Sequence, residues 1–197
     1  MSRGLGDVYK RQGLLPFFFE NNSFEKYCDF ALDVPMYFIQ RGKEIIDCKG
    51  LSFKKFLVNS EKSLEKYEPT LDDWKNHLST IFTEVRLKQY LEIRSADSCS
   101  WSGICSIPAF WTGILYNDLV LDEAFDYVKN WKYEEVNEAY HGFVSKGFKT
   151  ELDKKNIKKH AEYFLNLSRK GLELRNKLNA NNAVSYTHLR AHETPVN

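Results

Sequence analysis

The chain of 197 residues has little of several features that mark large classes of protein. Four cysteines without a Cys-x-x-Cys spacing exclude a scaffold built on disulfides and favour a reducing compartment. The 28 lysine and arginine residues balance 27 aspartate and glutamate residues, so net charge does not point to nucleic acid. The longest apolar runs, residues 13–19 and 104–116, are too short or too interrupted to cross a bilayer. We therefore expect neither a nucleic-acid nor a membrane partner.

The short motifs of several enzyme classes are missing too. The sequence has no Gly-rich dinucleotide motif, no P-loop, no Gly-x-Ser-x-Gly turn and no His-Glu-x-x-His helix. It is nevertheless 43% hydrophobic and 15% aromatic, which is enough apolar surface to build a core. Length and composition predict one globular domain, or one domain and a fragment.

The two ends of the chain differ from the rest. Residues 1–12 and 183–197 lack amphipathic period and helix caps, and they resemble translated sequencing-adapter DNA. We therefore expect the native segment to be residues 13–182. His188 and His192 have the spacing of a zinc pair, but the neighbouring Glu193 lies outside the pair and the segment is foreign, so we reject a metal site there.

Hydrophobic periodicity and capping residues predict an α+β fold: an antiparallel sheet with flanking helices and a helical C-terminal portion. Ser23, Ser52 and Thr70 each stand where a helix N-cap is needed, and Thr70 with Asp73 resembles a capping box. The Thr70 helix is predicted to continue through Phe82. The other predicted elements are a hairpin of residues 34–40 and 44–48 around a turn at 41–43, and helices over 108–116, 121–131, 133–144 and 153–178.

Residues 84–94 (EVRLKQYLEIR) carry the clearest strand pattern. Odd positions are apolar, with Gln89 as the one exception, and even positions are polar or amphipathic. A period of two over this length predicts one half-buried strand. Glu92 and Arg94 then lie on the same face, about 6–7 Å apart along the strand.

A carboxylate beside a guanidinium on a rigid strand suits a site for Mg²⁺ and phosphate. Mg²⁺ prefers carboxylate oxygens and is commonly shared with nucleotide phosphates. Arginine holds phosphate oxygens with a planar fork that keeps its charge. The residues alone leave a second interpretation open, in which Glu92 and Arg94 form ion pairs on the solvent-exposed face of a sheet. Tyr37 also has two interpretations. Its hydroxyl could orient a small substrate, or its ring could pack in the core with the hydroxyl in solvent.

Four stretches in one continuous order resemble the plant-type glutamate–cysteine ligases, a family shared by plants and many bacteria. They are FALDVPMYFI (30–39), IDCKGLSFKKFL (46–57), PTLDDWKNHLSTIFTEVRLKQYLEIRSAD (69–97) and CSIPAFWTGILYND (105–118). The resemblance covers most of residues 13–182 and implies the C-terminal half of such an enzyme, part of a catalytic fold related to glutamine synthetase.

The resemblance also implies a reaction. ATP, with Mg²⁺, phosphorylates the γ-carboxylate of L-glutamate, and the amine of L-cysteine displaces phosphate from the acyl phosphate, in the first step of glutathione synthesis. In the family's Tyr-Leu-Glu-x-Arg strand the glutamate is a metal ligand and the arginine contacts the phosphate-bearing substrate. The resemblance therefore implies that Glu92 is a metal ligand. It implies that Arg94 is a substrate-binding and catalytic residue. The family's Val-Pro-Met-Tyr-Phe strand carries over to Tyr37 as a lining residue of the cysteine pocket.

The sequence departs from the family in places. Residues 98–103 replace the family's Gly-Gly-Pro-Trp-Arg-Arg run, and Cys48 and Cys105 occupy cysteine positions whose partners are missing, so we expect no disulfide switch in this chain. Because the family's first half is absent, we expect the chain alone to be inactive and prone to aggregate through uncovered strand edges. A bacterial-like cytoplasmic location is expected, with a plastid still open. The alternatives are a related ATP-dependent carboxylate–amine ligase using another amine, and a non-catalytic α+β binding module.

Overall fold

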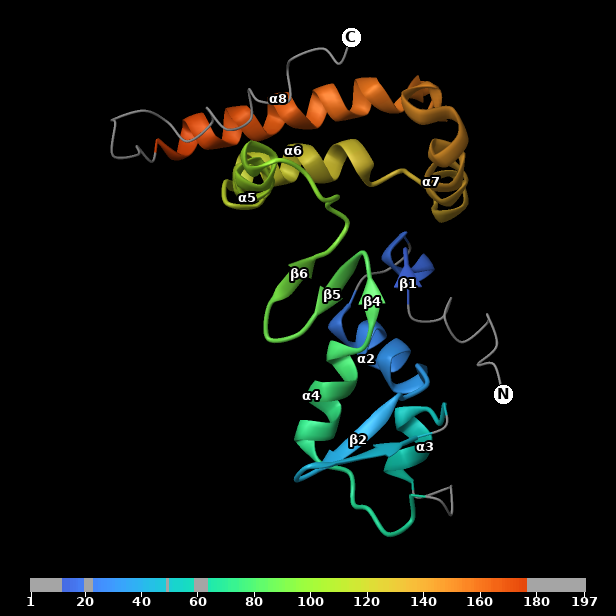
Figure 1. Ribbon diagram of the computed structural model, residues 1–197. Coiled ribbons are helices and arrows are strands. Elements are labelled where there is room, and N and C mark those ends of the chain that lie inside the picture. The colour runs from blue at the N-terminus through green and yellow to red at the C-terminus, as the bar shows by residue number, and fades with distance from the viewer. Residues whose placement is uncertain (1–11, 20–22, 49, 59–63, 177–197) are drawn as a thin grey trace. The chain divides into compact units, whose positions relative to one another are not determined.

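The computed structural model describes residues 12–19, 23–48, 50–58 and 64–176, and the chain divides into two units, residues 1–95 and 96–197 (Figure 1). The first unit mixes short helices with pairs of strands, and the second is mostly helical. The expected α+β composition and the helical C-terminal portion are therefore confirmed. The histidine pair at 188 and 192 lies outside the described residues.

In its described residues the first unit contains ten short elements. In chain order they are β1 (Gln12–Gly13), the 3-10 helix η1 (Pro16–Phe19), α2 (Phe24–Asp33), β2 (Phe38–Arg41), β3 (Glu44–Asp47), α3 (Phe53–Leu57), α4 (Leu71–Ser79), β4 (Phe82–Thr83), β5 (Val85–Leu87) and β6 (Leu91–Ile93). The strands pair two by two: β1 with β4 is parallel, and β2 with β3 and β5 with β6 are antiparallel. The prediction of one antiparallel sheet is therefore confirmed only in part: in the described residues the strands form separate pairs, and the β1–β4 pair is parallel.

The predicted helix caps are confirmed. Ser23 accepts a hydrogen bond from the Lys26 amide at 3.2 Å, and Ser52 caps α3 in the same way. Thr70 and Asp73 form the predicted capping box, in which each side chain accepts a hydrogen bond from the backbone amide of the other. The predicted end of this helix was wrong, because α4 stops at Ser79 and Phe82 belongs to β4.

Arg41 joins the β2–β3 hairpin to the N-terminal end of α4. The predicted hairpin is confirmed, but its first strand is Phe38–Arg41 rather than residues 34–40, so the turn is Gly42 and Lys43. Gly42 has a φ of 58°, a conformation that glycine enters without steric cost. Next to this turn, Arg41 donates to both carboxylate oxygens of Asp73, at 2.7 and 2.9 Å. Burial raises the pKa of Asp73, but the hydrogen bonds from Arg41 and Thr70 outweigh it and hold the pKa below its ordinary value.

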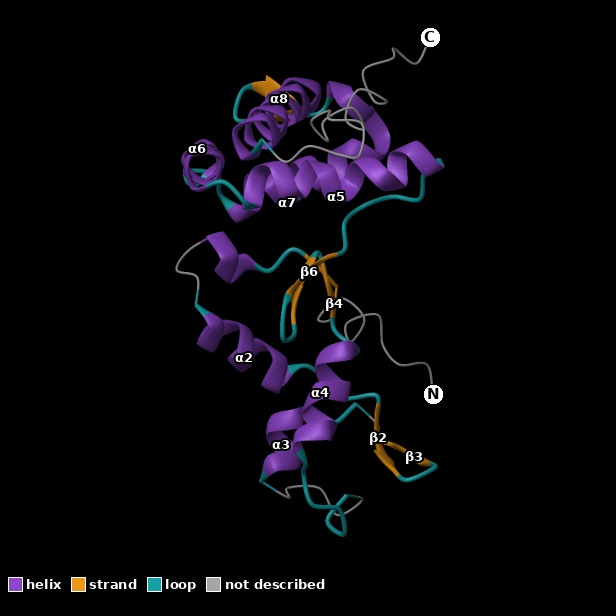
Figure 2. Cartoon of the chain, turned by 90° about the vertical axis from the view of Figure 1, so that its left-hand side faces the viewer, coloured by secondary structure: helices purple, strands orange, loops and turns teal. Residues whose placement is uncertain are grey.

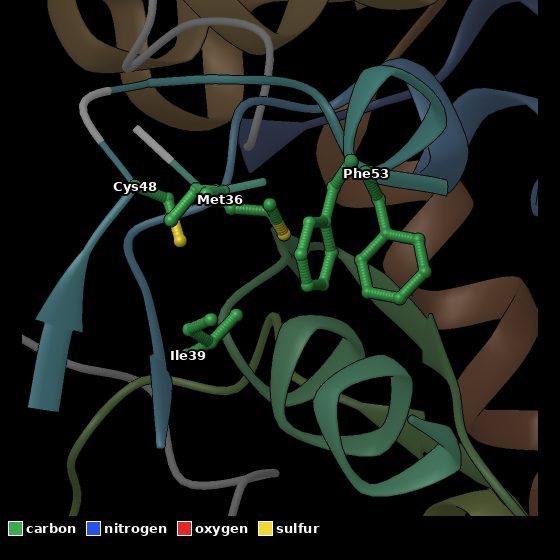
Figure 3. Close-up of a cluster of buried hydrophobic side chains, with 6 residues drawn as sticks. Met36, Ile39, Cys48 and Phe53 are labelled. Carbon is green, nitrogen blue, oxygen red and sulfur yellow. The ribbon is translucent and has the colours of Figure 1, made fainter. Parts of the chain in front are cut away.

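Apolar side chains pack between this hairpin and the short helices. Figure 3 shows Met36, Ile39, Cys48 and Phe53 in this cluster, which also contains Phe56 and Leu64. Cys48 is 2% exposed, and burial raises the pKa of its thiol to about 11. The thiol is therefore protonated at neutral pH and acts here as a small apolar side chain.

The second unit is built around three packed helices. Its elements are α5 (Trp101–Leu115), α6 (Asp118–Val128), α7 (Tyr133–Lys146), the 3-10 helix η2 (Gly147–Lys149), β7 (Glu151–Leu152), β8 (Lys155–Asn156) and α8 (Ile157–Arg175). Ile114 of α5, Val120 and Ala124 of α6, and Leu167 of α8 form its buried cluster. Within the described residues no single helix is long and apolar enough to cross a membrane. Helices α5 and α6 together have the length and apolar composition of a membrane span, but the chain bends by 91° between them.

Three helices in this unit have predicted boundaries that were wrong by more than two residues. The helix expected over residues 121–131 is Asp118–Val128. The helix expected from Pro108 begins at Trp101, so Pro108 lies inside α5 and has no N–H for the carbonyl of Ile104. The helix expected from Asp153 begins at Ile157. Asp153 and Lys154 have positive φ angles and form the tight turn between β7 and β8, and Asn156 then caps α8.

Helices α5 and α8 cross at a point that only glycine permits. A Cβ on Gly171 would lie 1.8 Å from the carbonyl oxygen of Gly113, and a Cβ on Gly113 would lie 2.2 Å from the carbonyl oxygen of Ser168. Ser168 also donates a hydrogen bond of 2.8 Å to the carbonyl of Phe110 across the crossing. Close backbone approach therefore sets the geometry of this unit.

Asp73→Asn tests the link between the hairpin and α4. Because the pKa of Asp73 is lowered in the folded state, its contribution to stability is present above the ordinary pKa of an aspartate and is lost as pH falls through the lower folded value. We expect the substitution to lower the free energy of unfolding by about 1–3 kcal/mol at neutral pH and by much less at about pH 2. Urea unfolding followed by Trp74 fluorescence, with the other three tryptophans replaced by Phe, measures this.

Asp72→Asn is the matched control, because Asp72 is 85% exposed and pairs only at the surface with Lys75. It should change stability by less than about 1 kcal/mol at either pH. An Asp73→Asn effect that does not depend on pH would contradict the assignment.

Gly171→Ala tests the crossing of α5 and α8. The added methyl group must push the helices apart, and we expect a loss of at least about 1–3 kcal/mol in urea unfolding followed by helical circular dichroism. Gly142→Ala in α7 is the control. Its Cβ meets only the Thr150 side chain, no closer than 3.4 Å, so the higher helix propensity of Ala should leave stability unchanged or slightly raised. Equal effects of the two substitutions would show that the crossing is not tight.

Candidate functional site

The segment that carries the predicted site is a hairpin. Residues 84–94 do not form the single strand that was predicted: β5 and β6 run antiparallel, with Val85 opposite Ile93 and Leu87 opposite Leu91. The chain reverses around Gln89, where the Lys88 amide donates to the Tyr90 carbonyl at 2.9 Å. The Arg94 amide closes the open end by donating to the Glu84 carbonyl at 2.9 Å.

The alternating sequence pattern does not reveal this turn, and the reason is geometric. The hairpin is symmetric about one residue, Gln89, so each residue pairs with one an even number of positions away. Odd positions on both strands therefore share one face, and even positions share the other. Alternation continues through the turn unbroken, and the only sign of the reversal is that Gln89 is the polar exception among the odd positions.

The hairpin brings one carboxylate between two guanidiniums. Arg86 of β5 lies opposite Glu92 of β6 and donates to its Oε2 from Nε at 2.9 Å and from Nη2 at 2.6 Å. Arg94 donates to the other oxygen, Oε1, at 2.6 Å. The expected proximity of Glu92 and Arg94 on one face is therefore present, and the three side chains together carry one net positive charge. We call Arg86, Glu92 and Arg94 the charged triad.

The charged triad is anchored at the C-terminal end of α4. Arg86, which is 7% exposed, also donates from Nη1 to the carbonyls of Ser79 at 2.6 Å and Ile81 at 3.1 Å. The last carbonyls of a helix lack partners within the helix and carry partial negative charge, so a guanidinium is well placed there. The Phe82 ring completes the surroundings, with its centroid 5.4 Å from the guanidinium carbon of Arg94.

The electrostatics keep Glu92 ionised. Its hydrogen bonds from Arg86, more than that from Arg94, hold the pKa of Glu92 below its ordinary value against a smaller effect of burial. Arg94 and Glu92 are each about 30% exposed, at 29% and 28% of their side-chain surface. A partly solvated guanidinium can hold an anionic group such as phosphate, and Arg94 supplies the donors for it.

Glu92 fits Mg²⁺ only as one ligand among several. Oε2 is engaged by Arg86, which leaves Oε1, now paired with Arg94, as the oxygen that a cation could share. No group of three or more His, Cys, Asp and Glu side chains in the described ranges could hold a metal ion. Mg²⁺ is often bound through one or two carboxylates and completed by water and substrate phosphates, and one carboxylate oxygen is compatible with that mode.

Tyr37 lies on a different element from the charged triad. It is half-buried and directly precedes β2, where its carbonyl accepts a hydrogen bond of 3.1 Å from the Cys48 amide. In both views the β2–β3 hairpin lies at one end of α4, while β4 and the β5–β6 hairpin lie at the other (Figures 1 and 2). The structure thus joins Glu92 with Arg94, whereas the role of Tyr37 stays a prediction.

Sequence reasoning missed Arg86. Its position in the alternating pattern indicated only a polar face, and the single-strand interpretation placed it six residues from Glu92. The signal that could have found it is Gln89: a turn centred there puts positions 86 and 92 opposite one another.

Comparison with known proteins identifies the family. The family description "Glutamate-cysteine ligase family 2 (GCS2)" matches residues 7–191. The chloroplastic glutamate–cysteine ligase of Medicago truncatula is 46% identical over 166 residues, which cover 84% of this chain and 33% of that protein. The chloroplastic ligase A of Oryza sativa subsp. indica is 46% identical over 84% of this chain and 34% of its own length, and the Arabidopsis thaliana enzyme 44% over 84% and 32%.

The chain is a homologue of plant-type ligases, and it belongs to glutamate–cysteine ligase family 2. It spans about a third of the length of the curated relatives it matches. The family match begins within residues 1–12 and ends within residues 183–197, and the boundaries of the native segment stay a prediction.

Substitutions of Glu92 test the charged triad. Glu92→Leu leaves the buried Arg86 without its carboxylate, and we expect a loss of about 1–3 kcal/mol in the free energy of unfolding, measured by urea with Trp74 fluorescence. Glu92→Gln keeps an acceptor oxygen of the same shape and should cost less. If both variants were as stable as the parent, Arg86 would not depend on Glu92.

Proposed function

We propose that this chain is the part of an ATP-dependent glutamate–cysteine ligase that carries Glu92, Arg94 and Tyr37. The substrates are L-glutamate, L-cysteine and ATP, and the reaction is the first step of glutathione synthesis. The observation that carries the proposal is the contact between Glu92 and Arg94 on the hairpin face, in a chain of this family. By itself the chain is inactive, because it spans about a third of the length of its relatives.

The proposed chemistry needs charge neutralisation and alignment rather than a protein nucleophile. Transfer of a phosphoryl group from ATP to the glutamate γ-carboxylate makes an acyl phosphate, and the cysteine amine then displaces inorganic phosphate. Arg94 holds the oxygens of the transferred group through its fork of N–H donors. Bound Mg²⁺ would neutralise phosphate charge, with Oε1 of Glu92 as one of its ligands.

Tyr37 has the proposed role of substrate orientation. It is half-buried and directly precedes β2, and a tyrosine combines an apolar ring with a polar hydroxyl that can orient a small polar molecule. In the proposal it lines the cysteine pocket, within a catalytic fold related to glutamine synthetase. A ligase of the same superfamily that uses another amine would share the charged triad and differ in this pocket, so the amine is the part of the proposal that rests on Tyr37.

The function is tested in a hybrid enzyme. Residues 13–182 replace the aligned segment of the Medicago truncatula relative, and the hybrid is assayed for ATP- and cysteine-dependent formation of γ-glutamylcysteine. We expect activity in the hybrid, and a loss of at least about 100-fold in kcat for Glu92→Gln and for Arg94→Gln, since each removes a charge used in the transition state.

Lys75→Gln is the control, because Lys75 forms an exposed pair with Asp72 and lies outside the triad. It should leave kcat within about twofold of the hybrid. Unchanged turnover in a folded Glu92→Gln hybrid would contradict the role of Glu92, and a folded parent hybrid without turnover would favour the non-catalytic binding module. Turnover with other amines in place of cysteine would favour the related ligase.

A further inference from the structure

We propose that Arg86 is a positioning residue, which fixes the Glu92 carboxylate and through it the Arg94 guanidinium. This inference deepens the proposed function and rests on it for its catalytic consequence. Its structural part concerns contacts within one unit of the chain and does not depend on any ligand.

The geometry of Arg86 supports a role in orientation. Its Nε and Nη2 converge on a single oxygen of Glu92, Oε2, at 2.9 and 2.6 Å. Two donors on one oxygen leave Oε1 to Arg94, so the carboxylate has one oxygen toward each arginine. Rotation of the Glu92 carboxylate would break its contacts with both arginines. Arg86 therefore sets which carboxylate oxygen faces Arg94.

The burial of Arg86 makes this orientation rigid. Its side chain is 9% exposed, while those of Glu92 and Arg94 are 28% and 29% exposed. Nη1 is held by the carbonyls of Ser79 and Ile81, the latter residue being fully buried. Contacts therefore run from the end of α4 through the largely buried Arg86 to the more exposed pair of Glu92 and Arg94.

A second arginine in the same unit serves as a matched control. Arg41 also donates two hydrogen bonds to a carboxylate, that of Asp73, and one to each of two backbone carbonyls, those of Gln40 and Glu68. It lies at the other end of α4 and has no contact with Glu92 or Arg94 among those described. Substituting Arg41 removes a comparable set of contacts without touching the triad.

The test is the mobility of Arg94 in the 197-residue chain. The order parameter of its Nε–H bond is measured by ¹⁵N relaxation, with the signal assigned by its loss in Arg94→Lys. In the parent chain we expect an ordered side chain, and in Arg86→Met a fall below about 0.6, the range of flexible groups. Arg86→Lys keeps the positive charge but lacks the fork, and should give the same fall, whereas Arg41→Lys should not.

The catalytic consequence is measured in the hybrid enzyme. Loss of a residue that orients a ligand typically costs about 10–100-fold in activity, so kcat should fall by that factor in Arg86→Lys and by less than about twofold in Arg41→Lys. An inactive parent hybrid would overturn the proposed function and leave the Arg94 mobility result standing.

Three outcomes would overturn the positioning role. One is an Arg94 side chain that is equally ordered in folded Arg86→Lys. Another is an equal fall in order or in kcat for Arg41→Lys. The third is failure of both Arg86 variants to fold while Arg41→Lys folds, because Arg86 would then hold the unit together rather than orient the triad.

Discussion

A carboxylate held between two guanidiniums is the interaction on which the candidate site depends. Glu92 has one oxygen toward the buried Arg86 and the other toward the partly exposed Arg94. Removing the carboxylate would bring two positive groups together without a counter-charge, and removing Arg86 would release the carboxylate from α4. The site is therefore a property of the hairpin and the end of α4 together, rather than of a strand alone.

Arginine–carboxylate pairs mark both ends of α4. At the N-terminal end Arg41 meets Asp73, which also accepts hydrogen bonds from Thr70. At the C-terminal end Arg86 meets the carbonyls of Ser79 and Ile81. A helix of nine residues has little stability by itself. The Thr70 hydroxyl accepts from the Asp73 amide at its N-terminal end, and Arg86 donates to the Ser79 carbonyl at its C-terminal end, so both ends gain partners that the helix itself lacks.

The local parts of this fold could be predicted from sequence, as could the reversal at Gly42, but two other reversals of the chain could not. Ser23, Ser52 and Thr70 were found because a cap is a local hydrogen bond between residues three positions apart. The turn at Gln89 was missed because a hairpin centred on one residue preserves the alternation of its strands. The turn at Asp153 and Lys154 was missed because neither residue is a glycine, although both have positive φ.

In the candidate site, too, the contact between residues close in sequence could be predicted and the contact across the turn could not. Glu92 and Arg94 are two residues apart, so their shared face followed from strand geometry even though the strand was half of a hairpin. Arg86 is six residues away along the chain, and only the cross-strand register brings it to Glu92.

The most direct test of the central claim is a crystal structure of the hybrid ligase with ATP and Mg²⁺ bound. We predict guanidinium nitrogens of Arg94 at hydrogen-bond distance, about 2.7–3.2 Å, from phosphate oxygens, with Arg86 still on Oε2 of Glu92. A nucleotide bound with its phosphates away from the β5–β6 hairpin, and no phosphate contact to Arg94, would contradict the account.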